Sequence, residues 1–186
     1  MKTKIIIIFI MILVMTCPVA YAESDWTFTF FGINSRDFKD REPLPIIAGA
    51  IMSIVVHEGG HLIGGRISGM ETSMRVYDGR PTVWATDYDN KSDNEKALYH
   101  GGGFLAQALI GTAITSIPRS RHADFTVGFN SMTMVQNITY PLGTTSAREG
   151  NDCKNLDRYD YNGDGIAIAG GTYAGVLTYI SLNKEE

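Results

Sequence analysis

The feature that most constrains this chain is a long apolar segment with almost no charge. Between residues 44 and 70 the only acidic side chain is Glu58, and no basic side chain precedes Arg66. An apolar stretch of this length is long enough to cross a bilayer as a helix. Its second half contains glycines at positions 59, 60, 64 and 65. Glycines weaken a helix in water, whereas inside a membrane bundle small residues let helices approach closely, so the composition favours a membrane helix.

This segment contains the motif His57-Glu58-Gly59-Gly60-His61, which fits H-E-x-x-H. Residues four apart share one face of a helix, so both imidazoles can reach one ion. Zinc favours such nitrogen ligands, and it lowers the pKa of a bound water to about 7. Glu58 lies beside the two histidines and can take a proton from that water. A chance match is disfavoured because an acid between two histidines in an apolar helix is costly unless it has a function.

A catalytic zinc site normally has three protein ligands and one open position. The candidates for the third ligand are His100, His122, Asp157, Asp160 and Asp164. Both histidines also fit a simpler interpretation as loop residues at segment ends. Asp164 is favoured because it stands immediately before the last apolar segment.

The same stretch admits two other interpretations. Asp160, Asn162 and Asp164 follow the first half of a calcium-binding loop, although Gly171 stands where such a loop ends in glutamate. Alternatively, the Asp and Asn side chains form a polar turn that caps the last helix.

Three further apolar segments follow the first, at residues 101–117, 125–142 and 166–182. Between the first and second, residues 73–77 and 82–86 alternate like strands, and Asp78-Gly79 between them favours a hairpin turn. We therefore expect a mostly α fold: a small membrane bundle of three to four apolar helices with a short β-hairpin insertion.

The N-terminus has the organisation of a secretory signal. Lys2 and Lys4 precede an apolar run from Ile5 to Val14, and a small-x-small pattern ends at Ala22. We predict a signal peptide over 1–22, or an uncleaved membrane anchor, then an exported segment over 23–43 and a membrane metalloprotease-like domain over 44–183. The alternative location is a soluble extracytoplasmic one, which the mean hydropathy of -0.04 keeps open.

Charge and cysteine content exclude two other classes of protein. The net charge of -4 lacks the basic footprint typical of nucleic-acid binding. With Cys17 inside the predicted signal, Cys153 is the only other cysteine, so no disulfide framework is expected and cysteine does not ligate the metal.

In type and order, several motifs resemble those of the site-2 proteases, a family of intramembrane zinc metalloproteases. His57 to Arg66 is similar to that family's first motif, residues 72–86 to its strand-rich insertion, and 101–107 to its glycine-rich helix start. Asn137 followed by Pro141, and then Asp164-Gly165, are similar in order to its last motifs. The chain departs from the family at Gly163, where leucine is usual, and in the long interval between Pro141 and Asp164.

The resemblance implies zinc-dependent hydrolysis of a membrane protein or peptide substrate in or at a lipid bilayer. In that case His57, His61 and Asp164 bind zinc, Glu58 activates the zinc-bound water, and Asn137 helps to hold the substrate or polarise its carbonyl. The alternatives are a soluble exported zincin-like protein and a non-catalytic membrane protein that binds zinc or, at Asp160, Asn162 and Asp164, calcium.

Overall fold

The computed structural model describes residues 29–30, 33–77, 80–141 and 151–183, and their fold is mostly helical. The predicted signal over 1–22 and the turn at 78–79 lie outside these residues. The longer elements are the strands β3 (Thr72–Tyr77) and β4 (Arg80–Ala85) and the helices α3 (Pro43–Ile67), α4 (Asp93–Ser116), α6 (Asp124–Thr139) and α8 (Gly163–Leu182). The shorter ones are β1 (Thr29–Phe30), β2 (Ile33–Asn34), η1 (Ser35–Phe38), η2 (Tyr88–Asn90), α5 (Pro118–Arg121) and α7 (Asp152–Arg158).

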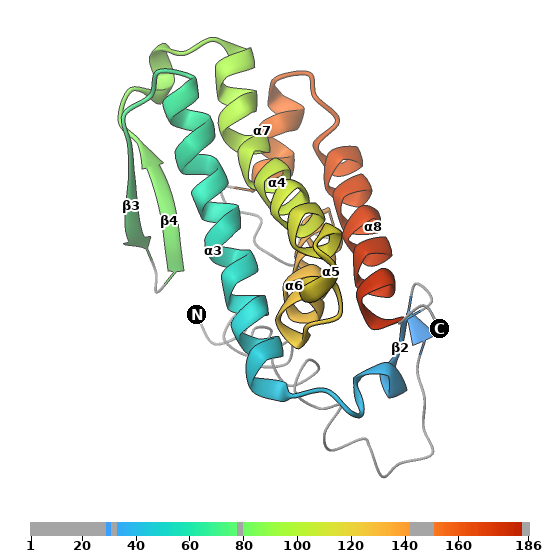
Figure 1. Ribbon diagram of the computed structural model, residues 1–186. Helices are drawn as coiled ribbons and strands as arrows, with labels where there is room; N and C mark the ends of the chain where they lie inside the picture. The colour runs from blue at the N-terminus through green and yellow to red at the C-terminus, as the bar shows by residue number, and fades with distance from the viewer. Residues whose placement is uncertain (1–28, 31–32, 78–79, 142–150, 184–186) are drawn as a thin grey trace.

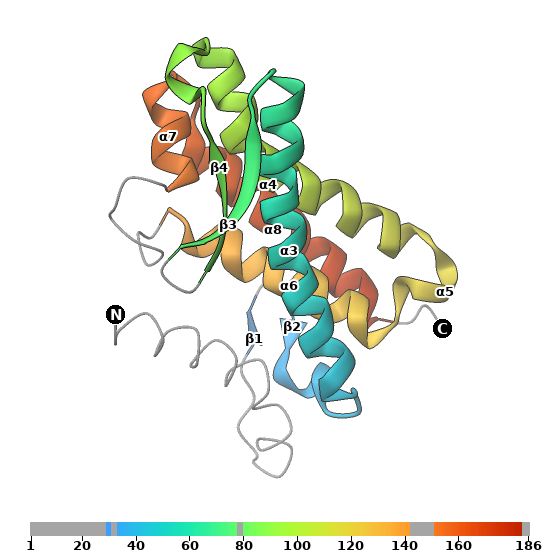
Figure 2. The ribbon, with the colours of Figure 1, turned by 90° about the vertical axis from the view of Figure 1, so that its left-hand side faces the viewer.

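The four long helices form one bundle (Figure 1). Helix α3 packs against α4 and α6, and α8 packs against the same two helices. Strands β3 and β4 pair antiparallel, with Thr72 opposite Ala85, and this hairpin lies along the outer side of α3 (Figure 2). The short helix α7 contacts α4 and α8. The expected mostly α fold with a β-hairpin insertion is therefore confirmed for the described residues.

Local sequence explains where these helices begin. Pro43 stands at the first turn of α3, where a missing N–H costs nothing. Ser92 and Glu95 form a capping box at the start of α4, because each side chain accepts a hydrogen bond from the other residue's backbone N–H. Asn162 caps α8 by accepting from the Gly165 N–H.

Glycine allows α3 and α4 to touch backbone to backbone. A Cβ atom on Gly60 would lie 2.2 Å from the Gly102 carbonyl oxygen, and one on Gly102 would lie 2.5 Å from the Gly60 oxygen. Such distances leave no room for a side chain. The close helix contact expected from the glycine-rich sequence is thus present.

The interior of the bundle contains polar as well as apolar side chains, and many large apolar side chains lie on its exterior. Ser53, Gln107, Asn130 and other polar side chains are almost fully buried. Many large apolar side chains on α3, α4 and α8 are instead exposed, among them Ile51, Val55, Ile63, Leu105, Leu109, Val176 and Ile180. Among the described residues, α3 and α8 are the two helices long and apolar enough to cross a membrane. Helices also form at the other two predicted segments, but α4 and α6 do not meet that criterion, so the described residues contain fewer candidate spans than the three to four apolar helices expected.

Candidate metal centre

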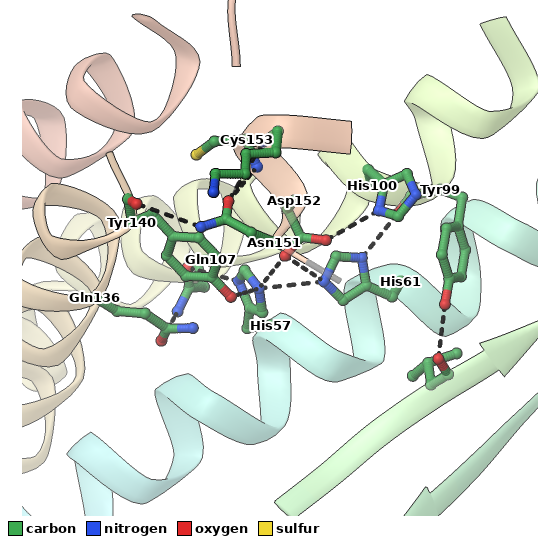
Figure 3. Close-up of polar contacts among 12 residues, drawn as sticks. His57, His61, Tyr99, His100, Gln107, Gln136, Tyr140, Asn151, Asp152 and Cys153 are labelled. Carbon is green, nitrogen blue, oxygen red and sulfur yellow. Dashed lines mark hydrogen bonds and ion pairs between the residues drawn. The ribbon is translucent and has the colours of Figure 1, made fainter. Parts of the chain in front are cut away.

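The two histidines of the motif lie one turn apart on the inner face of α3. His57 is fully buried and His61 is 5% exposed. Their Nε2 atoms are 3.2 Å apart, and both rings point toward the start of α7 (Figure 3). The helical spacing argument therefore holds, and the two nitrogens converge on one point.

Asp152 supplies the third atom of the group. It is the first residue of α7 and is buried. Its Oδ2 atom lies 3.3 Å from His57 Nε2 and 3.3 Å from His61 Nε2. These three atoms form a nearly equilateral triangle. In a tetrahedral site with bonds of about 2.0–2.1 Å, neighbouring ligand atoms are about 3.3–3.4 Å apart, so the triangle has the dimensions of a metal site. The group of His57, His61 and Asp152 could hold a metal ion.

The structure does not bring the predicted third ligand, Asp164, into this group. Asp164 is exposed in the first turn of α8. Its neighbours form a polar turn whose side chains bond the backbone. Asn162 caps the helix, and Asp157 Oδ1 accepts a hydrogen bond from the Gly163 N–H. The capping interpretation of this stretch is confirmed for Asn162.

Neither of the other candidate histidines joins the triangle. His122 lies at the far end of α4, where its Nδ1 atom bonds the Ser181 carbonyl. His100 lies on α4 and bonds Asp152 instead: its Nδ1 atom is 3.0 Å from Oδ1, the oxygen that faces away from the triangle. His100 Nε2 bonds the Tyr88 hydroxyl at 2.8 Å, and that hydroxyl bonds Tyr159.

Hydrogen bonds on the far side of each ring fix the direction of the motif histidines. His57 Nδ1 lies 3.2 Å from Gln107 Oε1, and His61 Nδ1 lies 2.8 Å from the Tyr99 carbonyl oxygen. Gln107 donates its own amide to Ser53, so its oxygen must face His57. Both partners are acceptors, so each Nδ1 carries a proton, and Nε2 is the atom of each ring that would give its lone pair to a metal.

The Asp152 carboxyl is in the ionised form that a metal ligand needs. Burial acts to raise the pKa of this carboxyl, but the nearby His61 charge and hydrogen bonds from His100 and His57 outweigh it and hold the pKa well below its usual range. Asp152 is therefore ionised at neutral pH. Burial raises the pKa of the adjacent Cys153 thiol to about 12, which keeps the thiol protonated at neutral pH.

Gly103 of helix α4 leaves space for the His57 ring. A Cβ atom on Gly103 would lie 2.6 Å from His57 Cε1, so any side chain there would displace the ring. This contact gives a physical reason for the glycine-rich start of the second apolar segment.

The remaining predicted residues, Glu58 and Asn137, do not belong to the triangle. Glu58 is half-buried beside Val83 of β4 and interacts electrostatically with both histidines and Asp152. Asn137, on α6, is 1% exposed, and neither atom of its amide group has a hydrogen-bond partner among the described residues. Sequence reasoning did not single out Tyr140, whose hydroxyl lies 3.2 Å from His57 Nε2.

No family model, curated protein or solved structure matches this chain significantly.

Proposed function

We propose that this protein is a zinc-dependent peptidase that acts in or at a membrane. The observation that supports it most strongly is the buried triangle of two imidazole nitrogens and one carboxylate oxygen, with Glu58 beside it. Two histidines and one carboxylate form a typical ligand set of a catalytic zinc site. The exposed apolar faces of α3 and α8, together with the motif order shared with site-2 proteases, support a membrane location and a peptide substrate.

The chain's own residues have distinct tasks in this reaction. His57, His61 and Asp152 would hold the ion, which when bound supplies a Lewis acid for the scissile carbonyl and acidifies water. Glu58 takes the proton from the attacking water and gives it to the leaving amine nitrogen. Gln107 and the Tyr99 carbonyl keep both rings directed at the ion. The buried position of these groups keeps bulk water away from the reacting bond.

The test uses the full chain purified in detergent and a mixture of apolar fluorogenic peptides. Zinc content and hydrolysis are measured for Glu58→Gln, with Glu71→Gln, an exposed glutamate in the loop after α3, as the control. Glu58→Gln should keep its zinc and lose hydrolysis roughly 10²–10⁴-fold, because a general base contributes that much. Full activity in this variant would refute the proposed mechanism.

A matched pair of variants tests the third ligand. Asp152→Ala should lose zinc, because one corner of the triangle is removed, whereas Asp164→Ala should keep it, because Asp164 lies outside the group. Zinc that persists in both variants, with no hydrolysis in the unmodified chain, would favour a non-catalytic metal protein.

A further inference from the structure

Tyr140 lies next to the metal group, although the proposed reaction gives it no role. It is the residue directly after α6, and its ring packs against the rings of His57 and Phe104, with centroids 5.7 and 5.5 Å away. These contacts place the phenol group over the triangle rather than in solvent (Figure 3).

The position of the phenol oxygen matches that of a ligand. It is 3.2 Å from His57 Nε2, the same separation that joins His57 Nε2 to His61 Nε2. The phenol also interacts with the Asp152 side chain. Its distance from His57 Nε2 is therefore close to that between neighbouring ligands of a tetrahedral ion, about 3.3–3.4 Å.

We propose that the Tyr140 oxygen is a fourth, displaceable ligand of the resting metal site. The inference rests on the metal site of the proposed function and adds a regulatory feature to it. The phenol releases its proton to water when the oxygen binds the ion, as metal binding generally requires of a protonated ligand. Four protein ligands close a zinc site, and a catalytic site needs an open position, so substrate must displace Tyr140 before the reaction begins.

Copper gives a readout that does not depend on hydrolysis. The full chain in detergent is stripped of metal and loaded with Cu²⁺, since a phenolate bound to Cu²⁺ gives a charge-transfer band in the visible region. We expect this band in the unmodified chain and its loss in Tyr140→Phe. Tyr173→Phe is the control, because the Tyr173 side chain is exposed on α8 and its hydroxyl bonds Thr112. Zinc affinity should also fall roughly tenfold in Tyr140→Phe and stay unchanged in the control.

A second variant separates lost coordination from damaged folding. Tyr140→His should keep tight zinc binding, because it offers another ligand, but should lack the phenolate band. A copper-loaded, unmodified chain without the band would overturn the proposal, as would an identical band in Tyr140→Phe.

The two proposals fail in distinguishable ways. A phenolate band in a chain that hydrolyses no peptide would support the Tyr140 ligand and refute the peptidase. Hydrolysis that depends on Glu58, in a chain without the band, would refute the ligand and support the peptidase.

Discussion

At the scale of single residues, the second oxygen of Asp152 matters as much as the first. Oδ2 faces the two motif histidines, while Oδ1 bonds His100, which in turn bonds Tyr88. A carboxylate held at both oxygens cannot rotate freely, so the chain of hydrogen bonds keeps Oδ2 directed at the ion. Groups that orient a ligand in this way commonly affect metal affinity almost as much as the ligand itself.

Replacing His100 tests this orienting role. His100→Ala should weaken zinc binding about 10–100-fold, because Asp152 loses its fixed direction without losing its charge. Affinity is measured by competition with a chromogenic chelator. His122→Ala is the matched control, since that histidine bonds Ser181 at the far end of the bundle. Equal affinity in the two variants would show that Asp152 needs no such support.

Sequence predicts the part of the site that depends on local spacing. His57, Glu58 and His61 follow from the geometry of one helix, and the structure brings the two histidines together as expected. Asp152 does not follow from sequence because it is 95 residues from His57 and enters a different, short helix. The choice of Asp164 relied on its position before the last helix, but at the first turn of α8 its side chain is exposed.

At the scale of elements, the contact between α3 and α4 determines whether the site can form. The histidines come from α3, whereas Gly103 and Gln107, which accommodate and orient His57, come from α4. The two backbones meet at Gly60 and Gly102, so even a methyl group there would push the helices apart.

Adjacent glycines provide a sharp test of this contact. Gly60→Ala should lower the Tm and abolish zinc binding, because its Cβ would lie 2.2 Å from the Gly102 oxygen. Gly59→Ala should leave the Tm unchanged or raise it, since no atom lies within 4 Å of its Cβ position and alanine favours a helix by up to about 1 kcal/mol. Both Tm values are measured by circular dichroism without metal. Similar values for the two variants would contradict the close-contact argument.

The sequence predicts the helices and strands that have a clear pattern of apolar residues. The four apolar segments form helices, and the two alternating stretches form β3 and β4. Helix α7 has no such pattern: it is one short polar stretch, buried mainly through Asp152, Cys153 and Leu156. Its existence depends on contacts with α4 and α8, which local propensity does not reveal.

At the scale of the whole molecule, polar side chains are buried beside the apolar core and large apolar side chains are exposed on the long helices. Polar side chains such as Ser53, Thr133 and Gln107 bond one another in the interior, while large apolar side chains cover the outside of α3 and α8. In lipid this arrangement is favourable, because the polar side chains that bond one another are satisfied inside the bundle and the apolar faces meet acyl chains.

A charge on the outer face of α8 distinguishes a membrane bundle from an exported soluble one. Val176 is 52% exposed on α8, and Val76 is 79% exposed on the hairpin. Val176→Lys should destabilise the membrane-inserted protein by about 2–3 kcal/mol, because a lysine within a membrane span is costly, whereas Val76→Lys should have little effect. The measurement is the fraction that stays in the membrane after alkaline carbonate extraction, which should fall for Val176→Lys alone.

If the unmodified chain is released by carbonate without detergent, its apolar faces are covered by something other than lipid, and the soluble zincin-like alternative is favoured. Retention of the unmodified chain, with selective loss of the Val176 variant, would place α8 in the bilayer and the metal group within a bundle that lipid surrounds.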